Sequence, residues 1–174
     1  EYNLEKARKL AEETGLTERT LLFYLPTDLE YLGEYFRQQL NEIGVSVVVS
    51  YLEIGKLFEN LESPDADMYF FGFKSTLGDS ADFLDTVMHT GGSFNFMKYS
   101  NKEVDELIDV GLTEIDNIKR LAALQEAMKI LVEDEMVGLP LFEYELIYAF
   151  DGEKIDLEPR IDSYLYYDEL TLKK

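Results

Sequence analysis

The stretch MYFFGFKSTLGDSADFLD, from Met68 to Asp85, is the part of the sequence that says most about the fold. Its first six residues, Met68 to Phe73, are apolar apart from Gly72, and such a run predicts a strand buried on both faces. Small and polar residues follow, and a helix is expected to begin at Asp79 or Ser80. Open α/β sheets place ligands where a buried strand leads through a loop into a helix N-terminus. The stretch therefore predicts a ligand site at the end of this strand.

Helical and strand patterns alternate along the rest of the chain. Apolar residues recur at helical spacing in some segments, and β-branched or aromatic residues cluster in others. This order implies an α/β fold with a largely parallel sheet and helices on both faces. The expected helices cover 3–14, 29–43, 55–61, and segments starting near 79, 100 and 116; the expected strands cover 20–25, 45–52, 68–73 and 141–150, with one more short strand after 159.

Capping signals predict where three of the helices begin. Thr27 with Glu30, and Ser100 with Glu103, have the spacing of a capping box, in which each side chain satisfies a backbone N–H group of the other residue. Asp116 is the expected N-cap of the next helix, because its carboxylate can accept from the first free N–H groups.

Composition limits the classes of function that are open to the chain. Its 174 residues can form one domain or two small ones. The 16 basic and 36 acidic residues give a net charge of −20, which argues against nucleic acid and anionic membrane surfaces as partners. That charge is compatible with steering of a cationic ligand or with plain solvation of helix faces. The absence of cysteine excludes disulfides and Cys-based zinc sites, and no apolar run approaches the roughly 20 residues of a membrane span.

Few residues suggest catalysis. The glycine-rich nucleotide motifs are missing, and the sequence contains a single histidine, His89, which gives no basis for a triad or a transition-metal site. Asp79, Asp82 and Asp85 are spaced by three, so a helix would hold them on one face. They fit a Ca²⁺ or acid–base cluster, or simply favourable charges at a helix N-terminus. We expect no catalytic residue, no metal and no cofactor.

Six motifs, in the same order along nearly the whole chain, resemble one protein family. They are YNLEKARKLAEETG at 2–15, FRQQL with EIGV at 36–45, DMYFFGF at 67–73, DSADFL at 79–84, YSNKEVD at 99–105 and LPL at 139–141. With these motifs the chain is similar to the C-terminal lobe of extracytoplasmic solute-binding proteins of the oligopeptide/dipeptide ABC-transporter type, the bacterial extracellular solute-binding protein family 5.

The resemblance implies a three-layer lobe of the type II periplasmic-binding-protein kind, with a late strand that is antiparallel or crosses toward a second lobe. Residues 1–174 would then be one domain, the C-terminal lobe of a larger bilobal receptor whose N-terminal lobe precedes Glu1. Two such lobes close on a small solute, an oligopeptide or an oligosaccharide, around a hinge. The implied partners are this N-terminal lobe and the permease subunits of the transporter, and the implied location is the periplasm or the outer face of the cytoplasmic membrane.

The resemblance also suggests the ligand-binding residues, with two departures from the family pattern. Phe73 stands where the family has Trp, which keeps an aromatic wall without an N–H donor. Thr76 stands where peptide-binding members have an Asp that pairs with the peptide amine, and a hydroxyl cannot supply that charge-assisted bond. Asp79 is a possible shifted anchor. The candidate ligand-binding residues are Phe73, Lys74, Ser75, Thr76 and Asp79.

Two other classes of function stay open from the sequence. A sensor or regulatory module can use the same lobe to detect a solute. An acid–base hydrolase would use Asp79, Asp82 or Asp85, and its turnover would disappear when one of them is changed to Asn.

Overall fold

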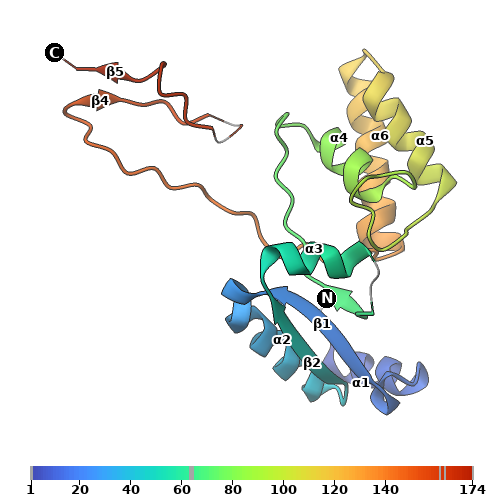
Figure 1. The fold of residues 1–174 in the computed structure, drawn as a ribbon. Helices are drawn as coiled ribbons and strands as arrows, with labels where there is room; N and C mark the ends of the chain where they lie inside the picture. The colour runs from blue at the N-terminus through green and yellow to red at the C-terminus, as the bar shows by residue number, and fades with distance from the viewer. Residues whose placement is uncertain (1, 63–64, 161, 163, 174) are drawn as a thin grey trace. The chain divides into compact units, whose positions relative to one another are not determined.

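The computed structural model describes residues 2–62, 65–160, 162 and 164–173 (Figure 1). The chain forms two compact units, Glu1–Gly72 and Phe73–Lys174, which we call unit 1 and unit 2 and describe separately. The expectation that residues 1–174 act as a single ligand-binding lobe stays a prediction.

Unit 1 is built on a parallel sheet with the strand order β2-β1-β3. Strand β1 (Thr20–Pro26) pairs along its whole length with β2 (Ser46–Leu52) and over two residues with β3 (Met68–Tyr69). The helices α2 (Glu30–Glu42) and α3 (Ile54–Glu62) make the connections that parallel strands require. The expected α/β fold with a parallel sheet is confirmed.

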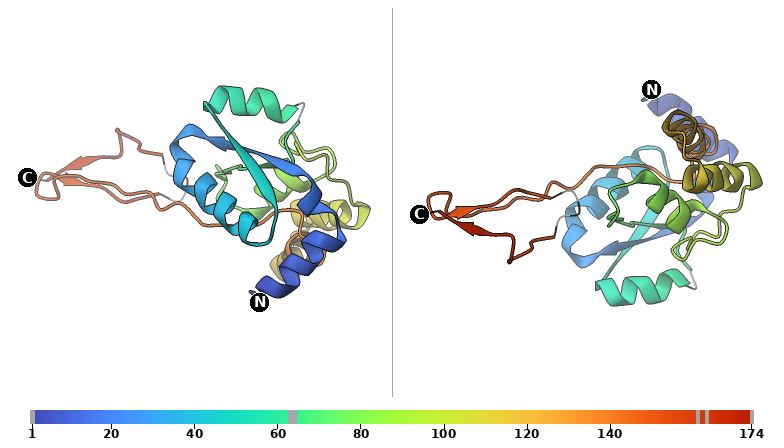
Figure 2. Two further views of the ribbon diagram at one scale, coloured as in Figure 1. Left: turned by 90° about the horizontal axis from the view of Figure 1, so that it is seen from below. Right: turned by 90° about the horizontal axis from the view of Figure 1, so that it is seen from above.

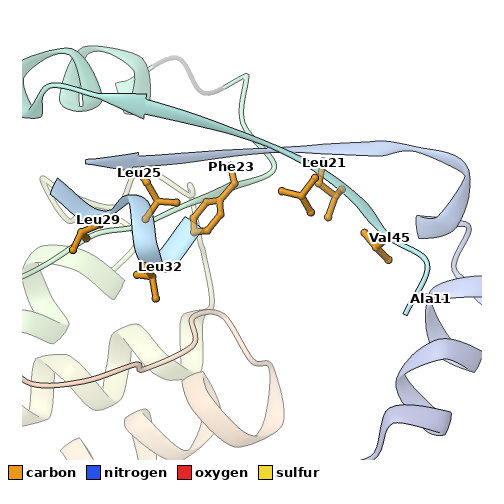
Figure 3. Close-up of a cluster of buried hydrophobic side chains, with 8 residues drawn as sticks. Ala11, Leu21, Phe23, Leu25, Leu29, Leu32 and Val45 are labelled. Carbon is orange, nitrogen blue, oxygen red and sulfur yellow. The ribbon is translucent and has the colours of Figure 1, made fainter. Parts of the chain in front are cut away.

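The core of unit 1 forms on one face of β1. Leu21, Phe23 and Leu25 alternate along the strand, so their side chains point to the same side (Figure 3). They pack with Leu32 of α2 and with Ala11 of α1 (Leu4–Glu13), and all five residues are buried. Figure 2 shows α2 lying along the strands. A short β-strand is thus held in place by apolar contacts from the helices that precede and follow it.

Helix α2 approaches the sheet closely because residue 33 is a glycine. A Cβ atom on Gly33 would lie 2.5 Å from the hydroxyl oxygen of Tyr51 and 2.9 Å from a methyl group of Val49. The Tyr51 hydroxyl donates to the carbonyl oxygen of Glu30 at 3.2 Å, which fixes the start of α2 against β2.

Two predictions for unit 1 are wrong. No capping box forms at Thr27, because a 3₁₀ turn, Thr27–Leu29, follows β1 and α2 begins only at Glu30, with Leu29 at its N-cap and no side-chain cap. The strand expected over 68–73 is only two residues long, and its residues are half-buried rather than buried on both faces. The ladder between β1 and β3 ends at Tyr24 and Tyr69, followed by one bond from the N–H of Phe70 to the carbonyl oxygen of Tyr24. Two residues further along β1 is Pro26, whose nitrogen has no hydrogen to donate.

Unit 2 contains three α-helices, α4 (Ser80–Phe83), α5 (Lys102–Thr113) and α6 (Asn117–Lys129), in the part of the chain that the structure describes. A π-helical turn extends α4 over Leu84–Met88, and another extends α6 over Ile130–Asp134. Helices α5 and α6 lie side by side (Figure 1). They touch closely at Gly111, where a Cβ atom would lie 2.2 Å from a methyl carbon of Leu124.

The first residues of α5 and α6 can be compared with the caps predicted at Ser100 and Asp116. Asp116 is the N-cap of α6 as predicted, since its carboxylate accepts from the N–H groups of Ile118 and Lys119. The capping box at Ser100 is wrong: Asn101 caps α5 instead and accepts from two N–H groups of the first turn.

The strand expected over 141–150 is also wrong. These residues belong to no strand, and nearly all of their side chains are exposed, on both sides of the expected alternation. A period-2 pattern becomes a strand only where a second strand supplies hydrogen-bonding groups. The pairing occurs further on, where β4 (Ile155–Asp156) and β5 (Thr171–Leu172) form a short antiparallel ladder, and β5 confirms the strand expected after residue 159.

Candidate functional site

The loop 73–79 opens unit 2 and leads directly into α4, as the sequence predicts. Ser75 organises it: the side-chain oxygen Oγ accepts from the backbone N–H groups of Leu77 and Asp79, each at 3.2 Å. The same hydroxyl donates to a carboxylate oxygen of Asp82 at 2.8 Å. The half-buried hydroxyl of Ser75 thereby connects the loop to the first turn of α4 and fixes the shape of the loop.

Asp79 ends the loop and caps the helix. Its oxygen Oδ1 accepts from the backbone N–H of Ala81 at 2.9 Å, which confirms the predicted helix start. Both carboxylate oxygens also accept from the Nη2 atom of Arg120, at 2.8 and 2.7 Å. The pKa of Asp79 is lowered, first by the bond from Arg120 and then by the Ala81 N–H group. Asp79 is therefore an ionised carboxylate with a cation already bound to it.

Arg120 is held from a second direction. Its Nε atom donates to the carbonyl oxygen of Gly111 at 2.7 Å, near the end of α5. One arginine on α6 thus joins α5 to the loop that precedes α4. Sequence reasoning missed this residue, because it belongs to no motif and lies 41 positions from Asp79.

The other three candidate residues differ in what they contact. The ring of Phe73 packs edge-on against Phe83 of α4, with 5.5 Å between ring centroids. The ammonium group of Lys74 lies over the ring of Tyr164, 4.5 Å from its centroid. Thr76 is exposed. The loop therefore carries a half-buried aromatic ring, an exposed cation and an exposed hydroxyl, whereas Ser75 and Asp79 bond to the loop and to α4.

The three aspartates at 79, 82 and 85 do not form a metal site. Asp79 pairs with Arg120, Asp82 bonds with Ser75, and Asp85 lies in the π-helical turn beyond α4. No group of three or more His, Cys, Asp or Glu side chains arranged to hold a metal ion occurs among the described residues. The Ca²⁺ interpretation of this spacing has no support in the structure.

His89 lies between two carboxylates of α5. Its Nε2 atom is 3.9 Å from an oxygen of Asp105 and 3.8 Å from one of Asp109, while Nδ1 accepts from the backbone N–H of Gly91 at 3.1 Å. The hydroxyl of Thr90 donates to Asp105 at 2.6 Å. These contacts attach the loop after α4 to the side of α5, which is a structural role.

A second polar cluster lies at the end of the α6 extension. The hydroxyl of Tyr99 donates to one oxygen of Glu135 at 2.6 Å, and the amide of Asn101 donates to the other at 2.8 Å. Burial, and then the bond to Glu135, raises the pKa of Tyr99 to about 12. This cluster joins the start of α5 to the point where α6 and its π-helical turn end.

Unit 1 contains a separate apolar hollow of about 430 Å³ between α1 and α2. It is lined by Tyr2, Asn3, Leu4, Lys6, Ala7, Leu10, Phe36, Gln39, Leu40 and Ile43. Within the described ranges, the structure contains no helix with the length and apolar character needed to cross a membrane.

Two known proteins that bind or transport peptides are similar to this chain in sequence. The dipeptide-binding protein DppE of Bacillus subtilis is 29% identical over 149 residues, which are 83% of this chain and 26% of that protein. The peptide transport periplasmic protein SapA of Salmonella typhimurium is 26% identical over 172 residues, which are 91% of this chain and 31% of that protein. No family model matches the sequence. The chain thus spans between about a quarter and a third of the length of these relatives.

Solved structures agree on the fold. The ABC transporter-associated periplasmic binding protein DppA of Helicobacter pylori, solved in complex with the peptide STSA, matches with a TM-score of 0.68 and 22% identity. The match covers 75% of this chain and 28% of that one. The predicted resemblance is confirmed: the chain is similar to peptide-type solute-binding proteins of ABC transporters, and its α/β fold is consistent with that of their lobes.

Proposed function

We propose that this chain is a solute-binding lobe of an ABC-importer receptor, and that the solute is captured when this lobe and a second one close on it. The observation that carries the proposal is the sequence likeness over 83% and 91% of the chain to proteins named for dipeptide binding and peptide transport. On this proposal residues 1–174 act as one lobe, the permease subunits are partners, and the protein is not an enzyme. It works outside the cytoplasmic membrane, a location supported by the likeness to SapA, which is called a periplasmic protein.

The loop 73–79 is the proposed ligand wall. Exposed Lys74 and Thr76 offer a cation and a hydroxyl to a ligand, and half-buried Phe73 offers an aromatic ring. Ser75 and Asp79 hold the backbone of the loop in place. Such a preformed wall lowers the entropy that binding must overcome. The proposed ligand-binding residues are therefore Phe73, Lys74, Ser75, Thr76 and Asp79. Of these, Ser75 and Asp79 act by fixing the shape of the loop.

A peptide is the first ligand to test, and an oligosaccharide is the second. The names of DppE and SapA, and the peptide in the Helicobacter pylori DppA complex, favour a peptide. Thr76 is the reason to keep the second class, since it supplies a neutral hydroxyl that suits a sugar as well as a peptide backbone.

Calorimetric titration of the full gene product tests the proposal. Panels of di- to pentapeptides and of oligosaccharides are titrated, and at least one peptide is expected to bind. A Lys74→Ala/Thr76→Ala double variant should then bind that peptide about tenfold more weakly, because two polar contacts are lost. Lys119→Ala is the matched control, since it removes another exposed lysine of unit 2. If no solute of either panel binds the unaltered protein, the receptor proposal is wrong.

A further inference from the structure

We propose that Arg120 is a specificity-determining residue, which occupies the carboxylate of Asp79 and so prevents the loop 73–79 from binding the ammonium group of a ligand. This inference rests on the proposed function, because it requires the loop to contact the solute. It assigns a role to a residue of α6 that lies outside the loop.

Asp79 would otherwise suit an ammonium group. Its side chain keeps 35% of its surface exposed, so solvent and solute can reach it. An ionised carboxylate attracts an ammonium group through a charge-assisted hydrogen bond. Access is therefore not what limits Asp79. The limit is the guanidinium group, which donates to both oxygens within 2.8 Å and balances the charge.

The position of Arg120 does not depend on Asp79 alone. The Nε bond to the Gly111 carbonyl holds the guanidinium group at the place where α5 and α6 meet. At that place Leu124 packs directly over Gly111, so the helix pair leaves little room for rearrangement. Only 22% of the Arg120 side chain is exposed. The cation is thus fixed by the helix pair, and a solute ammonium group would have to displace a partly buried guanidinium group whose Nη2 atom donates to both oxygens of Asp79.

Asp82 is the other carboxylate at the loop, and it has a different partner. It accepts from the hydroxyl of Ser75, which carries no charge. The two aspartates can therefore be separated by experiment, since only Asp79 should respond to a change of Arg120.

The test compares a peptide that has a free amino terminus with its acetylated form. Trialanine and N-acetyl-trialanine are titrated into the full gene product, and the ratio of their dissociation constants measures the preference for an ammonium group. Arg120→Gln should raise that preference about tenfold, the effect of one new charge-assisted bond. Adding Asp79→Asn to Arg120→Gln should return the ratio to the value of the unaltered protein, and adding Asp82→Asn should not.

A purely structural role for Arg120 would weaken both peptides equally and leave the ratio unchanged. That result, or a ratio that returns with Asp82→Asn instead of Asp79→Asn, overturns the inference. Should Arg120→Gln fail to fold, Arg120→Met keeps the hydrocarbon stem of the side chain and serves the same comparison.

A titration with glycinamide, which has an ammonium group and no carboxylate, keeps the inference separate from the proposed function. Glycinamide is followed by amide NMR on the 174-residue chain. With Arg120→Gln the amide signal of Ala81, which bonds to Asp79, should shift on addition of glycinamide, and with Arg120 in place it should not. Failure of both peptides to bind contradicts the receptor proposal for peptides, whereas an unmoved Ala81 signal in Arg120→Gln contradicts the inference.

Discussion

The two segments with the clearest strand patterns, 20–26 and 141–150, end in opposite environments. In β1 the side chains of Leu21, Phe23 and Leu25 are buried against α2, and both edges of the strand pair with neighbours. In 141–150, Leu146 is 57% exposed and Ile147 is 89% exposed, and the segment belongs to no strand.

The difference shows what alternation does and does not predict. A period-2 pattern describes two faces of an extended chain, and it says nothing about which other strand will supply backbone donors and acceptors. For β1 the partner follows after one short helix, at β2. After 141–150, the strands that the structure describes are β4 and β5, and these two pair with each other. A local pattern is therefore insufficient to predict a strand.

Hydrogen exchange should show the largest difference between the two segments. The amides of Phe23 and Leu25 lie in the central strand β1, which pairs along its whole length with β2, whereas those of Leu146 and Ile147 lie outside any strand. We expect exchange at Leu146 and Ile147 to be faster by a factor on the order of 10³, because core strands exchange only on larger opening. Mass spectrometry with fragment resolution on the 174-residue chain measures it. Equal protection would mean that 141–150 is paired in solution, and the comparison would fail.

Truncation of one leucine in each segment should lower the free energy of unfolding by very different amounts. Leu25→Ala removes a side chain with 0% exposure and should lower the free energy of unfolding of unit 1 by about 3 kcal/mol, through lost burial and the cavity it leaves. Leu146→Ala is the matched control and should cost less than about 0.5 kcal/mol. Urea unfolding followed by circular dichroism compares them. If Leu146→Ala lowered the free energy of unfolding as much as Leu25→Ala, the side chain of Leu146 would have to be buried in a core.

Much of the fold follows from local sequence, and the exceptions have physical reasons. The helix over 4–13 and the strands β1 and β2 were predictable, because each depends on periodicity and on residues close in the chain. The start of α5 was misplaced by one residue because Ser100 and Asn101 are both good caps. The choice depends on the backbone, which is extended at Asn101, with φ −145° and ψ 115°.

The candidate site could be located from sequence but not completed. The loop 73–79 follows from a run of apolar residues that changes to small and polar ones, and Asp79 follows as a helix cap. Arg120 does not, because its contact with Asp79 exists only after α5 and α6 pack together at Gly111. Ion pairs across tertiary contacts leave no spacing rule in the sequence.

Two glycines extend the comparison between packed and exposed regions. Gly111→Ala places a methyl group 2.2 Å from a carbon of Leu124 and should cost about 1–2 kcal/mol, because overpacking outweighs the gain in helix propensity. Gly152→Ala, between 150 and β4, meets nothing within 4 Å and should be nearly neutral. Thermal unfolding of the two variants and of the unaltered chain measures these differences in stability. A neutral Gly111→Ala would show that α5 and α6 are less tightly packed than the structure has them.

The smallest expected effect concerns Asp79 and its dependence on pH. Asp79→Asn keeps an oxygen that can cap α4 but loses the charge opposite Arg120. Because the Asp79 carboxylate is about one-third exposed, solvent screening limits the loss to about 1 kcal/mol at neutral pH. Arg120 lowers the pKa of Asp79 in the folded state below the ordinary value of 3.8. The ion pair therefore stabilises the fold above pH 3.8, and that stabilisation is lost as the pH falls through the lower, folded-state pKa.

The difference in unfolding free energy between the unaltered chain and Asp79→Asn should consequently be constant from pH 5 to 7 and shrink below about pH 4. Asp168→Asn in the exposed C-terminal segment is the control and should change little at any pH. Urea titrations at pH 7, 5, 4 and 3 measure the difference. If it keeps its full size at pH 3, the difference does not come from the charge of Asp79. In that case Arg120 would have to be regarded as a contact that stabilises the helix pair without controlling the loop.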